Sequence, residues 1–81
     1  MTSLRTSEKF ERRLNKIDNT IRLQIDKLID KIVINQEVGK PMKYDRKGTR
    51  EVYANPFRLS YSYDKSSDTL FLLNLYHKDK Q

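Results

Sequence analysis

Residues 57–77 read FRLSYSYDKSSDTLFLLNLYH and carry the clearest secondary-structure pattern of the chain. Apolar and polar side chains alternate in residues 57–63, the period of a strand with one buried face. A polar stretch follows, and residues 69–77 are then almost continuously apolar, as expected of a strand covered on much of both faces. We therefore predict a β-hairpin with strands over about 57–63 and 69–77.

A shorter strand is predicted just before this hairpin, over residues 50–53. It is joined to the hairpin through Ala54-Asn55-Pro56, in which Asn and Pro favour a tight turn. Upstream, Gly39 and Pro41 end the preceding helical pattern, since Gly accepts the left-handed conformation and Pro cannot extend a helix. The three strands form an antiparallel meander.

Two amphipathic helices are predicted at the N-terminus, over about 7–17 and 19–34. Ser7 and Asp18 are suitable N-cap residues. Apolar side chains recur at helical spacing in both segments and form one stripe on each. The stripes consist of Phe10, Leu14 and Ile17, and of Ile21, Ile25, Leu28, Ile29 and Ile32.

These elements predict an α+β fold in which an N-terminal helical hairpin packs on one face of a three- to four-stranded antiparallel sheet. The chain has 81 residues. A chain of this size buries about 60% of its unfolded surface, which allows one modest core. We expect a single domain over residues 1–81, with the second face of the sheet left to water or a ligand.

The charge of the chain favours an anionic partner. The formal net charge is +6, and a local excess of cations lies at Lys43, Arg46, Lys47 and Arg50. Cations bound to phosphates release counterions and add affinity that does not depend on sequence. Nucleic acid, acidic protein and anionic lipid all remain possible partners.

Composition also limits the cofactors and the location. Cysteine is absent and there is one histidine, so we expect neither a metal site nor another cofactor. No segment has the length and apolarity of a signal peptide or a membrane span. We expect a cytoplasmic protein without a membrane partner.

Strand alternation predicts what the uncovered face displays. If Leu59 faces the helices together with Phe57 and Tyr61, then Arg58 lies on the uncovered face with Ser60 and Ser62. In the last strand Phe71, Leu73 and Leu75 suit the core, whereas Leu72, Asn74, Tyr76 and Lys78 point outward. Arg58 and Lys78 then converge into a site for a phosphodiester. There are two simpler alternatives. Arg58 pairs with Glu51, or the tyrosines only cover the edge of the core.

Several motifs resemble RelE/ParE-type toxins, in the same order and over most of the chain. The most specific is Asn55-Pro56-Phe57-Arg58-Leu59-Ser60-Tyr61, which is similar to the family's aromatic-Arg-aliphatic-x-Tyr strand. Gly39-Lys40-Pro41-Met42 and Arg50-Glu51-Val52-Tyr53 precede it, and Leu73-Asn74-Leu75-Tyr76-His77-Lys78 is similar to the family's final strand.

The resemblance implies a toxin of a type II toxin–antitoxin pair. It implies a metal-independent endoribonuclease that cuts messenger RNA on the ribosome, with the ribose 2′-hydroxyl as nucleophile. The implied catalytic residues are Arg58, Lys78, His77 and Arg50, and the implied RNA-binding residues are Lys43, Arg46, Lys47 and Tyr76. The implied partners are an antitoxin, in a possible hetero-oligomer, and the ribosome with its messenger RNA.

Three features depart from the family pattern. Residues 1–6 are short for the family's first strand, Glu51 stands near a position where some members carry lysine, and no tyrosine follows Lys78. A ParE-like gyrase inhibitor, an inactive relative that binds its antitoxin, and a nucleic-acid-binding domain without catalysis therefore remain alternatives.

Overall fold

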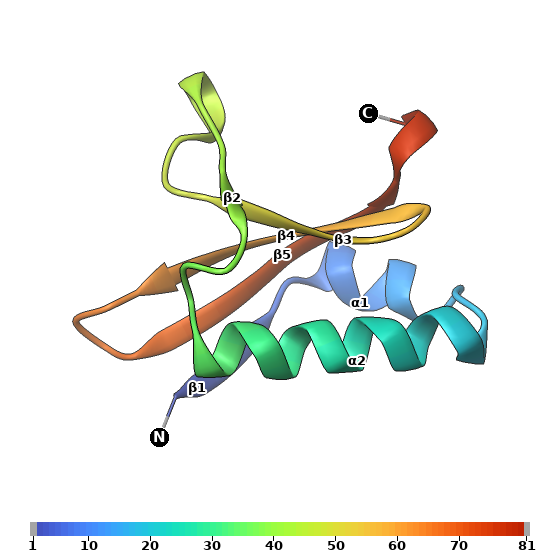
Figure 1. The fold of residues 1–81 in the computed structure, drawn as a ribbon, viewed down its shortest axis with the longest axis horizontal. Helices are drawn as coiled ribbons and strands as arrows, with labels where there is room; N and C mark the ends of the chain where they lie inside the picture. Colours follow the sequence, from blue (N-terminus) through green and yellow to red (C-terminus); the bar gives the residue numbers. More distant parts are fainter. Residues whose placement is uncertain (1, 81) are drawn as a thin grey trace.

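The sheet of this protein has five strands in the order β1-β5-β4-β3-β2 (Figure 1). The computed structural model describes residues 2–80. The strands are β1 (Ser3–Thr6), β2 (Lys40–Pro41), β3 (Arg50–Ala54), β4 (Phe57–Asp64) and β5 (Thr69–His77). The last three coincide with the predicted strands to within one residue. The α+β class is therefore as predicted.

The prediction of a three- to four-stranded antiparallel sheet was wrong. β1 pairs with β5 in parallel, from Ser3 opposite Thr69 to Thr6 opposite Leu72, which makes the sheet mixed. β2 adds a fifth strand beside β3. The four residues of β1 are exposed, so this strand has no buried face that could give a period-two pattern. Its strand conformation comes from its pairing with β5.

Two helices cover the sheet, α1 (Glu8–Leu14) and α2 (Asn19–Ile34). Ser7 and Asp18 cap them as predicted, each accepting a main-chain N–H three residues on, at 3.0 Å. The predicted end of the first helix at Ile17 was wrong. α1 ends at Leu14, and the N–H of Ile17 donates to the Leu14 carbonyl in a turn. The chain has to leave the helix here because Asp18 is extended in order to cap α2.

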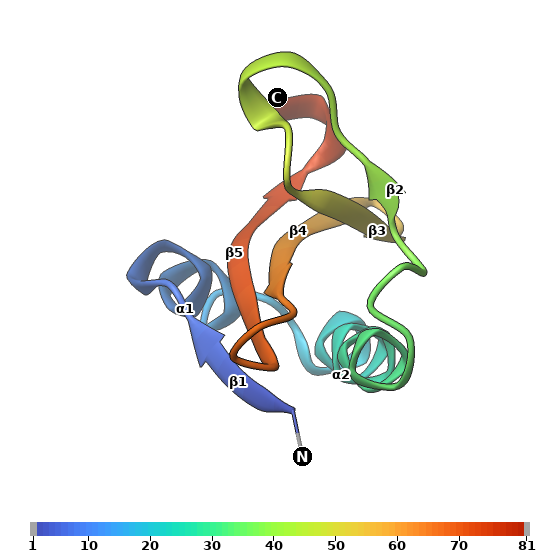
Figure 2. The same cartoon turned by 90° about the vertical axis from the view of Figure 1, so that its left-hand side faces the viewer.

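The core lies between the helices and one face of the sheet. Its buried side chains come from α1, α2 and the three central strands: Phe10, Leu14, Ile25, Ile32, Val52, Ala54, Leu59, Tyr61, Leu70, Leu72 and Leu75. α1 lies beside β5, and α2 runs below the opposite part of the sheet (Figure 2). Within residues 2–80, no helix has the length and apolarity needed to cross a membrane.

A bulge in β5 changes which side chains face the core. Ser60 pairs with Asn74 but Tyr61 pairs with Leu72, so Leu73 is an extra residue in β5. In residues 69–72, which precede the bulge, alternate side chains therefore face the opposite sides of the sheet from those that we predicted. Leu72 is buried instead of outward-facing, Phe71 is exposed, and Leu73 is half-buried outside the core. The predicted positions of Leu75 in the core and of Asn74 and Tyr76 on the other face are correct.

Candidate nucleic-acid interface

The face of the sheet away from the core, called the open face below, is built from two rows of paired residues. One row contains Glu51, Ser60 and Asn74 on β3, β4 and β5. The neighbouring row contains Tyr53, Arg58 and Tyr76. Partners in a register point to the same side of a sheet. Six side chains from three strands therefore share this face.

Arg58 and Lys78 lie around one hollow at the end of the open face. This Arg58 hollow has a volume of about 210 Å³ and is lined by Tyr53, Asn55, Pro56, Phe57, Arg58 and Lys78. The Arg58 guanidinium carbon is 5.1 Å from the centroid of the Tyr53 ring, a cation–π distance. Lys78 follows the end of β5, and its N–H donates to the Pro56 carbonyl at 2.9 Å. The predicted convergence of Arg58 and Lys78 is present, whereas Arg58 stacks on Tyr53 instead of pairing with Glu51.

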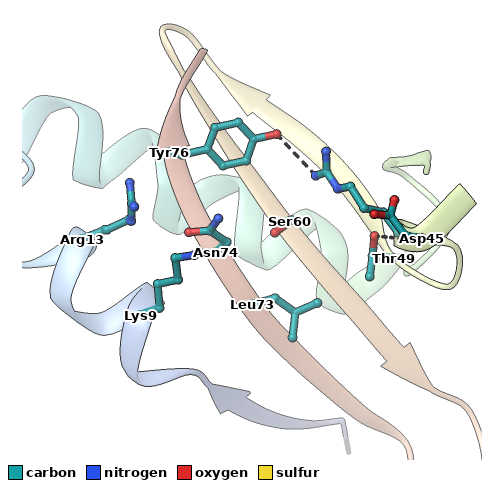
Figure 3. A pocket seen from close by; sticks show the side chains of 9 residues that line it. Lys9, Arg13, Asp45, Thr49, Ser60, Leu73, Asn74 and Tyr76 are labelled. Carbon is teal, nitrogen blue, oxygen red and sulfur yellow. Dashed lines mark hydrogen bonds between the residues drawn. The ribbon is translucent and has the colours of Figure 1, made fainter. Parts of the chain in front are cut away.

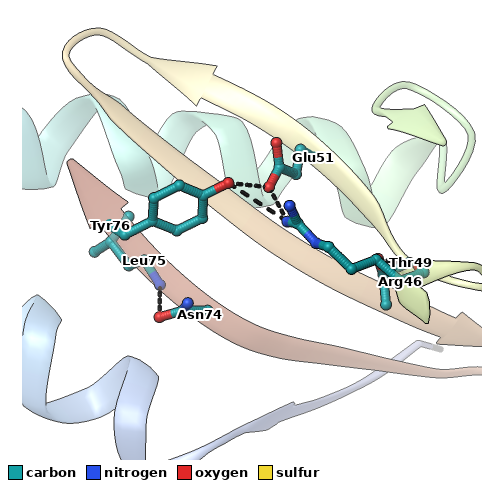
Figure 4. Close-up of polar contacts among 6 residues, drawn as sticks. All are labelled: Arg46, Thr49, Glu51, Asn74, Leu75 and Tyr76. Atoms are coloured by element: carbon teal, nitrogen blue, oxygen red, sulfur yellow. Dashed lines mark hydrogen bonds and ion pairs between the residues drawn. The ribbon is translucent and has the colours of Figure 1, made fainter. Parts of the chain in front are cut away.

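Glu51 forms the centre of a polar cluster with Arg46 and Tyr76 (Figure 4). Glu51 is 2% exposed and Tyr76 is 6% exposed. The Arg46 guanidinium and the Tyr76 hydroxyl both donate to the Glu51 carboxylate, and the guanidinium also contacts the hydroxyl oxygen at 3.4 Å. These contacts with Tyr76 and Glu51 raise the pKa of Arg46 above its ordinary value. Arg46 therefore remains a cation that compensates a buried carboxylate.

This cluster changes the interpretation of two predicted RNA-binding residues. Arg46 comes from the short helix η1 (Tyr44–Arg46) and is fixed on the open face by Glu51. The ring of Tyr76 is largely covered, so it forms a wall of the site and offers little surface for stacking a base. Lys43 and Lys47 flank η1 and are exposed.

A second concavity lies between α1 and the loop of residues 42–49 (Figure 3). This α1–loop pocket has a volume of about 490 Å³ and is lined by Lys9, Arg13, Asp45, Arg46, Thr49, Ser60, Leu73, Asn74 and Tyr76. Our sequence interpretation missed Lys9 and Arg13. The signal was present, because the polar side of the predicted helix carries cations at helical spacing. Lys9, Arg12 and Arg13 lie in α1, and Lys16 lies in the turn that follows it.

The position of α1 explains how these cations reach the open face. β1 pairs with β5 only as far as Leu72, so the rest of that edge of β5 is free for α1. The Ser7 hydroxyl donates to the Leu73 carbonyl at 2.6 Å and ties the start of α1 to the bulge. The apolar side of α1 then joins the core, and its basic side borders the open face.

The structure does not bring Arg50 and His77 together with Arg58. Arg50 is paired with Tyr61, which faces the core, and its guanidinium donates to the Gly39 carbonyl at 2.8 Å. His77 is paired with Phe57, also on the core side, and the two rings meet edge to face at 5.5 Å. Both residues therefore lie on the opposite side of the sheet from Arg58.

Acidic and imidazole side chains are not grouped for metal binding in residues 2–80. That part of the chain contains no set of three His, Asp or Glu side chains close enough to hold an ion.

Several solved toxin structures have the same fold as this chain. The toxin–antitoxin complex RelBE2 of Mycobacterium tuberculosis gives a TM-score of 0.83 at 23% identity, over 94% of this chain and 96% of that chain. The YoeB/ParE toxin of Agrobacterium tumefaciens gives 0.85 at 17% identity, over 94% and 98%. This chain has the RelE/ParE toxin fold. A metal-bound toxin of Helicobacter pylori also shares the fold, with a TM-score of 0.78 and 25% identity over 99% and 98% of the two chains.

The likeness in fold extends over nearly the whole chain and over nearly the whole of each neighbour. No family model and no curated protein sequence matches this chain. The RelE/ParE fold is thus recognised from the structure, and the resemblance of the sequence motifs is consistent with it.

Proposed function

We propose that this protein is the toxin of a type II toxin–antitoxin pair and that it cuts messenger RNA on the ribosome. The observation that carries the proposal is the Arg58 hollow, in which two cations border the open face of a RelE/ParE fold. Toxins of toxin–antitoxin complexes are among the structures with this fold. A basic chain with an uncovered sheet face suits a polyanionic substrate.

The residues of the hollow suit cleavage by the ribose 2′-hydroxyl. Arg58 can bind two oxygens of the scissile phosphate through parallel N–H donors. Tyr53 holds the guanidinium in place, and Lys78 stabilises the negative charge that develops on the phosphate. The substrate supplies the nucleophile, so the protein's task is alignment and charge stabilisation. We assign His77 no role in the hollow, because its ring packs on Phe57 on the opposite side of the sheet from Arg58.

A second candidate function is binding without cleavage, as a gyrase inhibitor or an inactive antitoxin-binding relative. The observation that favours it is the Glu51 carboxylate, which lies on the open face one ladder row from Arg58. It already binds Arg46 and Tyr76, so two groups that could contact a phosphate have a partner within the protein.

We also propose an antitoxin partner that covers apolar surface on α2. Leu23 is 62% exposed, and Ile34 is 84% exposed at the end of the helix. Val38, which follows α2, is 47% exposed. Leu23 and Ile34 are eleven residues apart, which puts them about three turns apart on one side of α2. Exposed apolar side chains on one side of a helix are suited to docking an extended partner segment. Coexpression with the cognate antitoxin should restore growth, and alanine at Leu23 and Ile34 should weaken this rescue.

The test is expression of the chain without a partner in cells. Messenger 5′ ends are mapped with and without functional ribosomes, and gyrase supercoiling is measured with the purified protein. Growth arrest with new ribosome-dependent 5′ ends supports the proposed ribonuclease. Growth arrest with gyrase inhibition and no new ends supports the second candidate. Neither activity, together with antitoxin binding, identifies an inactive relative.

A further inference from the structure

The loop of residues 42–49 projects from the sheet on the side opposite α2 (Figure 1, Figure 2). Hydrogen bonds fix its conformation. At its base the Met42 N–H donates to the Thr49 carbonyl at 3.0 Å. Within it the hydroxyl and the N–H of Thr49 donate to the Arg46 carbonyl, at 2.7 and 3.1 Å. The Arg46 guanidinium then ties the loop to Glu51 on β3. The loop is therefore held as a defined protrusion.

Tyr44 lies on this loop and does not belong to the core. It is 90% exposed, more than any other large apolar or aromatic residue that the structure describes. It lines neither the Arg58 hollow nor the α1–loop pocket. Packing therefore does not explain an aromatic residue at this position.

The backbone of Tyr44 is in the left-handed region, at φ 61°. This conformation is costly for a bulky residue, whereas Gly and Asn adopt it more readily. Two other described residues have a positive φ, and one of them, Gly48, is a glycine. The other is Asp68, whose carboxylate accepts two side-chain hydrogen bonds. The exposed ring of Tyr44 provides no comparable contact, and a strained residue that the fold does not require points to a function.

Two exposed lysines, Lys43 and Lys47, lie beside Tyr44 in the loop. Among the described residues neither lysine has an ion-pair partner. The acid of the loop, Asp45, lines the α1–loop pocket, which Tyr44 does not. An aromatic ring on which bases stack, beside cations that bind phosphates, is the combination by which proteins bind single-stranded nucleic acid. A nucleotide is the ligand that supplies a planar ring together with a phosphate, whereas an acidic peptide or a lipid headgroup is selected by charge alone.

We propose that Tyr44 stacks on an unpaired base of RNA and that the two lysines beside it bind the adjoining phosphates. The proposal rests on the proposed function, because it takes RNA as the ligand. The contact is separate from the cleavage site. Thr49, where the loop joins β3, lies four residues from Tyr53, the register partner of Arg58, which corresponds to about 13 Å along the strand. The Tyr44 contact therefore sets how tightly RNA is held and leaves the chemistry at Arg58 unchanged.

The first test detects stacking by fluorescence. The chain contains no tryptophan, so Tyr44→Trp places a single fluorescent probe on the loop. The full-length variant is titrated with a nine-nucleotide 2′-O-methyl oligoadenylate, which lacks the 2′-hydroxyl and is not cleaved. We expect the fluorescence to be quenched by the stacked base. An abasic oligomer with the same number of phosphates should leave it unquenched.

Thr20→Trp, at an exposed position near the start of α2, is the matched control and should not be quenched. Equal quenching of Tyr44→Trp by the abasic oligomer, or equal quenching of Thr20→Trp, overturns the stacking contact. Vesicles of phosphatidylglycerol provide a further comparison. A shift of the Tyr44→Trp emission by vesicles, without quenching by the oligoadenylate, would assign the loop to a lipid surface and overturn the proposal.

The second test separates a role of the ring in binding from a role in folding. Tyr44→Ala should weaken binding of the oligoadenylate by about fivefold or more, the effect of losing one stacked base, and Tyr44→Phe should retain it. Tyr44→Asn should weaken binding as well, while its melting temperature stays at or above that of the wild type, because asparagine tolerates the left-handed conformation. Wild-type affinity in Tyr44→Ala, or a lower melting temperature of Tyr44→Asn, overturns the proposal.

Mapping of 5′ ends on ribosomes distinguishes this proposal from the proposed function. New ends that Tyr44→Ala produces only at higher protein concentration support both. New ends without quenching of Tyr44→Trp leave the ribonuclease standing and remove the Tyr44 contact. Quenching without new ends leaves an RNA contact and removes the ribonuclease.

Discussion

The Arg58 guanidinium lies 5.1 Å from the centroid of the Tyr53 ring, its register partner on β3. A cation–π contact at a partly exposed site is worth about 0.5–1 kcal/mol. We expect Tyr53→Ala to lower ribosome-dependent cleavage by roughly twofold to fivefold, and Tyr53→Phe to retain it, because the ring remains. Single-turnover cleavage rates test this. Equal loss in the two variants would instead assign the effect to the Tyr53 hydroxyl.

Glu51 stabilises the link between the loop of residues 42–49 and the sheet. Glu51→Ala removes the carboxylate that accepts from Tyr76 and Arg46. Hydrogen bonds to charged groups contribute about 1.5–3 kcal/mol, so we expect the free energy of unfolding to fall by about that amount. Urea denaturation followed by circular dichroism measures it. Glu8→Gln, on the exposed side of α1, is the control and should change stability by less than about 0.5 kcal/mol.

Gly39 is required by the close approach of Tyr61. The Tyr61 hydroxyl accepts the Gly39 N–H at 2.9 Å and donates to the Gln36 carbonyl at 2.8 Å. A Cβ at position 39 would lie 2.6 Å from that hydroxyl oxygen and 2.9 Å from the Glu51 carbonyl oxygen. We expect Gly39→Ala to lower the free energy of unfolding by about 1–3 kcal/mol. Thermal unfolding measures the melting temperatures of Gly39→Ala and of the control Lys40→Ala, at an exposed position. Equal melting temperatures of the two variants would contradict the account.

Asp68 gives the stability of the β4–β5 turn a dependence on pH. Hydrogen bonds from the Tyr63 hydroxyl and from Thr2 hold the pKa of Asp68 below its ordinary carboxyl value. A lowered folded-state pKa contributes stability above the unfolded value, about 3.9, and that stability is lost as the pH falls through the folded pKa. We expect Asp68→Asn to be less stable than the wild type at pH 6, with a difference that begins to shrink as the pH falls below about 3.9 and vanishes below the folded pKa. Urea midpoints of both proteins at several pH values test this. A difference in midpoint that stays constant with pH would show that the titration of Asp68 does not cause it.

The sequence allowed prediction of the elements whose pattern depends on one buried face. β4 alternates over its whole length, so its strand, its parity and the position of Arg58 could all be predicted. Residues 69–73 are apolar at almost every position, so a one-residue bulge leaves no trace in the hydrophobic pattern. The orientations of Phe71 and Leu72 were therefore not predictable from period two.

Other parts of the site depend on contacts between distant segments. β1 is exposed and is defined by its pairing with β5. The contact between Arg46 and Glu51 depends on the conformation of the loop of residues 42–49. The alternation of side chains in a strand does not predict such a conformation. Arg50 and His77 could have been excluded from the open face by parity, because each has the parity of a core residue in its strand.

The central claim is that Arg58 binds the scissile phosphate on the open face of a ribosome-dependent ribonuclease. The most direct measurement is the mapping of messenger 5′ ends on ribosomes with wild type, Arg58→Ala and the exposed α2 variant Arg22→Ala. We expect the wild type and Arg22→Ala to give the same new ends, and Arg58→Ala to lose them by a factor of about 100 or more while remaining folded. A folded Arg58→Ala that cuts at the wild-type rate would contradict the account.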